Sequence, residues 1–173
     1  MNEAVPTKIK ELIKLLSNEE IEDEHVAELV PYFTEGLKNP KVYIETNPEE
    51  VWLAQGHDVN DLPPHIGQDV FTWMLGCELE DFLIVGDKGD DMAEFVIDDL
   101  SDYGVEIDFP QLKNWFEYDD YIEQALIKAK SNLKLITLDL NFSDNASIFI
   151  VPRDKYKELV ELLRFFGVKQ IKR

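Results

Sequence analysis

Carboxylates are the side chains of this 173-residue chain that are best placed to do chemistry. Asp87 directly follows an apolar run that ends at Gly86, and Asp139 and Asp144 belong to a later stretch of alternating polar residues. If these three carboxylates met at the ends of neighbouring strands, they could hold a divalent cation and activate water. Acids at the start of a helix are also ordinary capping groups. A small carboxylate-based, metal-dependent hydrolase is therefore one of the interpretations that the sequence leaves open.

Other metal-binding patterns in the sequence are incomplete. His57, Asp61 and His65 have helical spacing, but Pro63-Pro64 argues against a helix through all three. The stretch that begins at Asp139 imitates the start of a calcium loop, yet an aspartate stands where the turn needs glycine, and an isoleucine replaces the final glutamate. No metal site and no cofactor is predicted.

The sequence also lacks the patterns of nucleophilic catalysis. There is no Gly-x-Ser-x-Gly motif, and Cys77, the single cysteine, lies on the apolar face of an expected helix. No catalytic residue is assigned, so the sequence favours a protein that is not an enzyme without excluding one.

The charge is large and unevenly distributed. The chain has 36 acidic and 17 basic residues, a net charge of −19, of which −24 falls in residues 1–127 and +5 in residues 128–173. Two stretches are densely acidic, residues 19–24 and 87–108. Such a surface repels nucleic acid, which is not expected as a partner unless the C-terminal Lys169, Lys172 and Arg173 act alone. The acidity serves solubility alone, or it serves to bind a basic protein partner.

The elements that must position these side chains begin with helices. Residues 6–16 have the spacing of an amphipathic helix, and Asn18 is expected to cap a second helix in which Pro31 marks a bend or the end. Residues 41–44 are expected to form a short strand. Asn47-Pro48 starts a brief helix, and a longer one begins at about His65.

The second half of the chain has strand signals as well. A strand is expected over 81–85, helices over 90–103 and 121–130, a hairpin from 134–140 and 147–151, a helix over 154–166 and a strand over 168–171. Phe95 is expected to be buried in the first of these helices. The predicted fold is α+β: a single domain with a small, mostly antiparallel sheet packed by several helices, helical over 1–77 and sheet-containing over 78–173.

Large aromatic residues are further candidates for contact with a partner. Trp52 and Trp115 stand in short, polar contexts and are expected to be exposed, whereas Trp73 is in phase with a buried helix face. Phe142 lies in the polar tip of the expected hairpin, beside Ser143 and Asp144. Phe142 is expected either to fold back over the core edge or to face a ligand.

Two stretches resemble a family of bacterial proteins known only as a domain of unknown function. The first runs from Leu75 through the expected strand to Lys88; the second is Leu138-Asp139, Ser143-Asp144, the following strand and the C-terminal helix. The resemblance covers about residues 70–170, although no tryptophan precedes Lys88 here. It implies a compact bacterial α+β domain without a known activity, and it gives weight to Asp139, Ser143 and Asp144 as site residues.

The functional expectation combines these observations. The sequence favours a non-enzymatic, acidic protein-binding module, immunity-like in binding a basic partner, with contacts among the candidates named above. A structural housekeeping domain is a further alternative. No stretch of apolar residues is long enough to span a membrane and the N-terminus does not resemble a signal peptide, so a cytoplasmic protein is expected. The oligomeric state is not specified.

Overall fold

The fold is α+β, as the sequence predicts. It comes from a computed structural model of the chain, which describes residues 4–86, 90–140 and 146–171. The described α-helices are α1 (Ala4–Leu16), α2 (Asp23–Lys38), α3 (Pro40–Thr46), α4 (Ile66–Glu78), α5 (Asp90–Asp102), α6 (Trp115–Lys128) and α7 (Tyr156–Phe166). The described 3₁₀ helices are η1 (Pro48–Ala54), η2 (Glu80–Phe82) and η3 (Arg153–Lys155), and the strands are β1 (Leu83–Gly86), β2 (Leu133–Asp139), β3 (Ala146–Pro152) and β4 (Lys169–Gln170).

The described strands form one antiparallel sheet in the order β1-β3-β2-β4. β2 and β3 are the predicted hairpin, with Ile136 opposite Phe149. Gly167 ends α7 in the left-handed conformation, with φ of 75°, and lets the chain return to the sheet as β4. The predicted sequence of hairpin, helix and short final strand is therefore confirmed.

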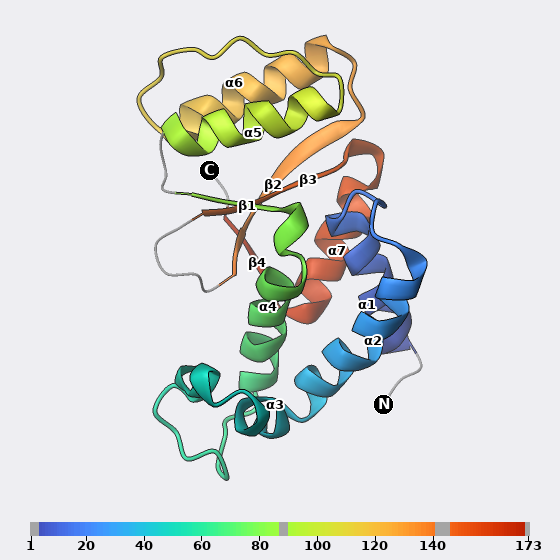
Figure 1. Cartoon of the computed structure of the whole chain (residues 1–173), viewed down its shortest axis with the longest axis vertical. Helices are drawn as coiled ribbons and strands as arrows, with labels where there is room; N and C mark the ends of the chain where they lie inside the picture. The colour runs from blue at the N-terminus through green and yellow to red at the C-terminus, as the bar shows by residue number, and fades with distance from the viewer. Residues whose placement is uncertain (1–3, 87–89, 141–145, 172–173) are drawn as a thin grey trace.

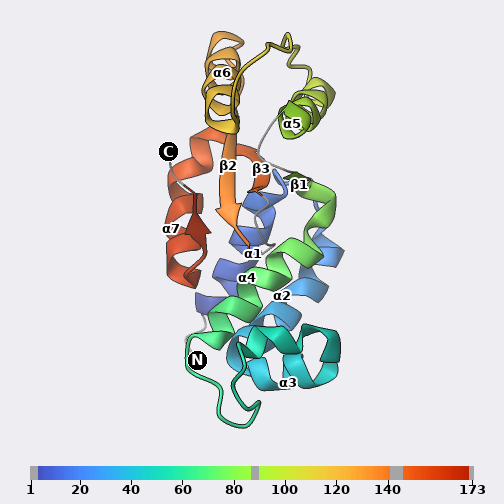
Figure 2. The same ribbon diagram turned by 90° about the vertical axis from the view of Figure 1, so that its left-hand side faces the viewer.

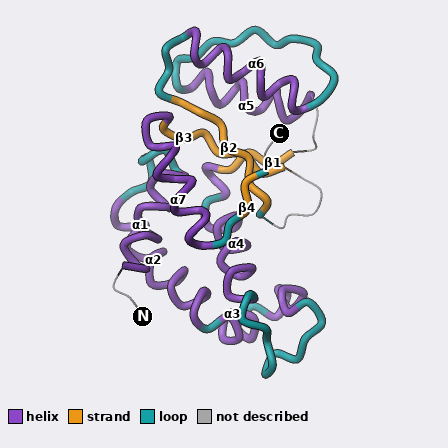
Figure 3. The backbone as a smooth tube through the Cα atoms, turned by 180° about the vertical axis from the view of Figure 1, so that it is seen from behind, coloured by secondary structure: helices purple, strands orange, loops and turns teal. Residues whose placement is uncertain are grey.

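Each face of the sheet carries its own apolar core, because side chains alternate across a strand. Ile136, Leu138 and Phe149 belong to the core shared with α1–α4 and α7. On the opposite face, Ile148 and Ile150 belong to the core shared with α5 and α6. The sheet thus lies between the α5–α6 layer at one end of the molecule and the larger helical layer (Figures 1, 2 and 3).

The prediction that Asn18 caps the second helix is wrong. Asn18 and Glu19 have φ of 50° and 65°, and the backbone N–H of Glu19 donates to the Lys14 carbonyl at 2.7 Å. These are the features of a helix C-terminus, so the pair ends α1. α2 begins only at Asp23, and it continues beyond Pro31 to Lys38.

The predicted strand over residues 41–44 is helical instead, as part of α3. Pro40 occupies the first turn, where its missing N–H is harmless, and the Thr46 hydroxyl donates to the carbonyl of Val42 at 2.8 Å. The adjacent residues Tyr43 and Ile44 are both buried, a pattern that a half-buried strand would not give. A four-residue run carries too little periodicity to distinguish the two structures.

α6 begins six residues earlier than the predicted start at Tyr121. Asn114 caps it: its side-chain oxygen accepts from the backbone N–H of Glu117 at 3.2 Å, and the Glu117 carboxylate accepts from the N–H of Lys113 at 3.1 Å. Trp115 is consequently buried, with 4% exposed, and the prediction of an exposed Trp115 is wrong. Burial of Phe95 is also wrong, since 52% of that residue is exposed.

None of the helices in the described part of the chain is long and apolar enough to span a membrane.

Candidate functional site

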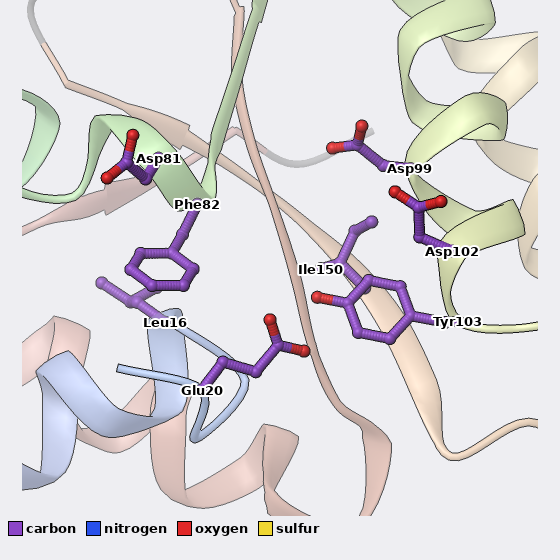
Figure 4. A pocket seen from close by; sticks show the side chains of 8 residues that line it. All are labelled: Leu16, Glu20, Asp81, Phe82, Asp99, Asp102, Tyr103 and Ile150. Atoms are coloured by element: carbon purple, nitrogen blue, oxygen red, sulfur yellow. The ribbon is translucent and has the colours of Figure 1, made fainter. Parts of the chain in front are cut away.

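A pocket of about 400 Å³ opens where the α5–α6 layer meets the larger helical layer, on the β1 side of the sheet. Its described lining combines carboxylates with apolar and aromatic side chains (Figure 4): Leu16, Glu20, Asp81, Phe82, Asp99, Asp102, Tyr103 and Ile150. We call it the acidic pocket. It draws on α1 and the turn after it, on η2, on β3 and on the end of α5, so its lining is brought together by tertiary packing.

The acidic pocket has an apolar base. Leu16 and Ile150 are buried members of the two cores, and the rings of Phe82 and Tyr103 stand on either side of the Glu20 carboxylate in Figure 4. Asp99 and Asp102 project from α5 toward the same space. A long, positively charged side chain could lay its methylenes against such rings while its head meets the carboxylates.

The carboxylates of α5 stand at the unfavourable end of their helix. The partial negative charge of a helix C-terminus favours lysine or arginine there and repels carboxylates. α5 nevertheless has Asp99 and Asp102 near its end, preceded by Asp98, and no basic residue in its last turn. Burial and the charges of Asp102 and Asp98 raise the pKa of Asp99 above its ordinary value. The ionised form of Asp99 is therefore held in an environment that disfavours it.

Tyr103 experiences the same excess of negative charge. Partial burial and the neighbouring Glu20 carboxylate raise the pKa of the Tyr103 phenol to about 12, so the hydroxyl stays protonated at neutral pH. A protonated phenol can donate a hydrogen bond but does not act as a base. Among the described residues that line the pocket, none is a lysine, an arginine or a histidine.

The arrangement is suited to binding a cation. Within the described ranges, no group of three or more histidine, cysteine, aspartate or glutamate side chains is placed to hold a metal ion. The acidic pocket can attract, orient and partly desolvate a cation. Its described lining contains no activated nucleophile, and the pKa of its one phenol, Tyr103, is raised away from neutral pH.

A second pocket, of about 430 Å³, lies near β4 at the opposite edge of the sheet, and its described lining contains an ion pair between Glu123 and Lys134. Its Glu123 carboxylate accepts from Arg153 Nη1 at 2.7 Å and from Lys134 Nζ at 3.0 Å. Lys134 Nζ also lies 4.9 Å from the centre of the Tyr156 ring. Although burial opposes it, the hydrogen bonds from Arg153 and Lys134 lower the pKa of Glu123 below its ordinary value. This ion-pair network joins α6 to β2 and η3.

Several of the sequence-predicted site residues cannot be placed. Asp87, Phe142, Ser143 and Asp144 lie outside the described residues, so their predicted contacts stay predictions. Asp139 is half-buried at the end of β2, opposite Lys169 of β4. Whether Asp139 converges with the other two carboxylates therefore stays a prediction as well.

The two tryptophans chosen as partner contacts differ. Trp52, in η1, is 46% exposed, as predicted, whereas the buried Trp115 belongs to the core beneath α6. The indole of Trp52 packs edge-on against Trp73 with ring centres 4.9 Å apart, and its Nε1–H donates to Glu50 Oε2 at 2.8 Å. Of these two tryptophans, Trp52 alone remains a candidate contact.

Cys77 and the histidines behave as the sequence suggests. Burial and the nearby carboxylate of Glu50 raise the pKa of the Cys77 thiol to about 11, so it stays a protonated, weakly reactive group. His57 lies in a turn and His65 precedes α4, with its Nε2 atom 3.9 Å from the Asp69 carboxylate. The three residues with helical spacing therefore do not share a helix.

The residues of the acidic pocket were not singled out by the sequence. The two densely acidic stretches contain three of its four carboxylates, because Glu20 belongs to residues 19–24 while Asp99 and Asp102 belong to residues 87–108. The fourth, Asp81, lies outside both stretches. What the sequence lacks is a sign that these stretches meet. One local feature of the sequence could have indicated the pocket. Asp99 and Asp102 lie near the C-terminal end of a clearly periodic helix, where N-terminal capping does not explain carboxylates.

Comparison of this chain with protein-family models, with curated proteins and with solved structures finds no match. The resemblance to a bacterial family of unknown function stays a prediction.

Proposed function

We propose that this protein is a non-enzymatic binding module whose acidic pocket receives a basic segment of a partner protein. The observation that carries the proposal is the uncompensated charge of Asp99 and Asp102 at the C-terminal end of α5. A lysine or arginine side chain from a partner would supply the positive charge that the helix end lacks. The sequence-wide charge of −19 adds long-range attraction that accelerates encounter with a basic protein.

The shape of the acidic pocket supports the same function. A pocket of about 400 Å³ with a buried apolar base can hold an extended side chain, which no flat acidic surface would do. Phe82 and Tyr103 offer rings for a guanidinium or an alkyl chain, and Glu20 offers a carboxylate between them.

The test is a binding measurement with a defined probe, a blocked heptapeptide that contains three arginines. We expect Asp99→Asn with Asp102→Asn to weaken binding about tenfold, the effect of about 1.4 kcal/mol from lost charge-assisted contacts. A matched control is Glu28→Gln with Glu161→Gln, which removes the same charge at two exposed positions on α2 and α7. The control should retain nearly the affinity of the unaltered protein.

Salt and the control variant decide between the proposal and its alternatives. The difference between the two double variants should shrink at about 0.3 M salt, because ions screen partly exposed charges. If both double variants weaken binding equally, the acidity acts only as a diffuse charge, as in a housekeeping domain that is merely soluble. If only the pocket variant weakens binding, capture of proteins from a native lysate at low and high salt is the step that identifies the partner.

A further inference from the structure

A second surface, at the α3–η1 end of the molecule, combines exposed aromatic rings with carboxylates. Tyr32 of α2 is 39% exposed and packs against the buried Tyr43 of α3, with ring centres 6.1 Å apart. Trp52 of η1 is 46% exposed and packs against Trp73 of α4. We call these four residues the aromatic surface. It lies at the end of the long axis opposite the α5–α6 layer (Figure 1).

The carboxylates of Glu50 and Glu78 connect the two ring pairs. Glu50 accepts a hydrogen bond from Trp52, and its charge also acts on Tyr43 and Cys77. Glu78 is half-buried and its charge acts on Tyr32. Burial raises the pKa of Glu78, and among the neighbouring charges His25 opposes this effect. In the described part of the chain, neither carboxylate forms an ion pair with a lysine or arginine.

We propose that the aromatic surface docks an arginine of a partner protein, with its guanidinium stacked on the Trp52 indole and paired with Glu50. Charge complementarity identifies the occupant: an exposed indole held beside a carboxylate attracts a cation to its face. A guanidinium fits better than an ammonium, because it is planar, stacks on aromatic rings and pairs with a carboxylate through two N–H groups. Exposed tryptophan and tyrosine are also the side chains that most often anchor protein interfaces.

This inference goes beyond the proposed function, because it uses a different surface. The aromatic surface shares no residue with the acidic pocket, so either surface can bind arginine if the other does not. A partner that reached both would gain affinity from two linked contacts.

The test follows the indole N–H signals of Trp52, Trp73 and Trp115 by NMR during titration with a blocked pentapeptide that contains two arginines. The expected result is a progressive shift of the Trp52 signal, with a Trp115 signal that does not move because that indole is buried. A peptide with citrulline in place of arginine keeps the shape but loses the charge, and should leave Trp52 unshifted. An unshifted Trp52 signal with the arginine peptide, or an equal shift with citrulline, would overturn the proposal.

Two variants separate this surface from the acidic pocket. Glu50→Gln should weaken the binding reported by Trp52 about three- to tenfold, while Glu161→Gln, the matched exposed control on α7, should not. Asp99→Asn with Asp102→Asn should leave the Trp52 response unchanged. Loss of the Trp52 response in that double variant would overturn the independence of the two surfaces. Unchanged binding of the three-arginine heptapeptide in the same variant, with an intact Trp52 response, would count against the acidic pocket alone.

Discussion

The two pockets lie at opposite edges of the sheet and differ in the charges that surround their carboxylates. Near β4, Glu123 is held by Lys134 and Arg153, and its pKa is lowered. In the acidic pocket, Asp99 and Asp102 have no described basic neighbour in the lining, and the pKa of Asp99 is raised. The volumes are similar, about 430 and 400 Å³. Glu123 thus lies between two cations, whereas Asp99 and Asp102 face none in the described lining, and this difference is what the proposed function rests on.

The largest expected effect on the free energy of unfolding concerns the ion-pair network of Glu123 near β4. Glu123→Gln leaves the half-buried Lys134 and Arg153 side by side without a carboxylate, and should lower the free energy of unfolding by about 2 kcal/mol. Chemical denaturation measures this change. Glu161→Gln, at an exposed position on α7, is the control and should change stability by less than about 0.5 kcal/mol. If Glu123→Gln left the free energy of unfolding unchanged, the ion-pair network would not contribute to stability.

The pH dependence of that variant sharpens the contrast. A carboxyl whose pKa is lowered by folding stabilises the protein above its unfolded pKa, and this contribution is lost as pH falls through the folded value. The stability difference between the unaltered protein and Glu123→Gln should therefore be full at neutral pH and should shrink below about pH 4.5, the ordinary pKa of glutamate. A difference that grows on acidification would contradict the assigned role of Glu123.

The sequence was informative where local physics decides the structure. The hairpin, α5 and α7 each have a clear period and a clear end, including left-handed glycines at 104 and 167, and all of them are confirmed. Asn18 misled because asparagine suits both a helix N-cap and a left-handed helix C-terminus, and only packing selects between them. The start of α6 could have been found from the spacing of Asn114 and Glu117, which is that of a capping box, although Glu117 accepts from the N–H of Lys113 and not from that of Asn114.

The acidic pocket depends on information of another kind. Glu20 and Asp99 are 79 positions apart in the sequence and meet only because α1 and α5 pack on opposite faces of the same sheet. A single sequence does not show which distant residues contact one another in the fold. It does show the excess of acidic residues, several of which line the pocket. This is why the charge excess is visible in the sequence while the residues that line the pocket are not, and the basic partner stays a prediction.

The central claim is that the carboxylates of Asp99 and Asp102 destabilise the folded protein. The most direct test is the free energy of unfolding of Asp99→Asn with Asp102→Asn, measured from pH 4 to pH 8. A carboxyl whose pKa folding raises destabilises the protein increasingly as pH rises through that value, so removing it should help most at neutral pH. We expect a gain of about 0.5 kcal/mol at pH 7, the size of a solvent-screened helix-end interaction, that fades toward pH 4. The charge-matched Glu28→Gln with Glu161→Gln should gain less. A double variant in the pocket that is less stable than the unaltered protein at pH 7, or no more stable than the matched control, would contradict the claim.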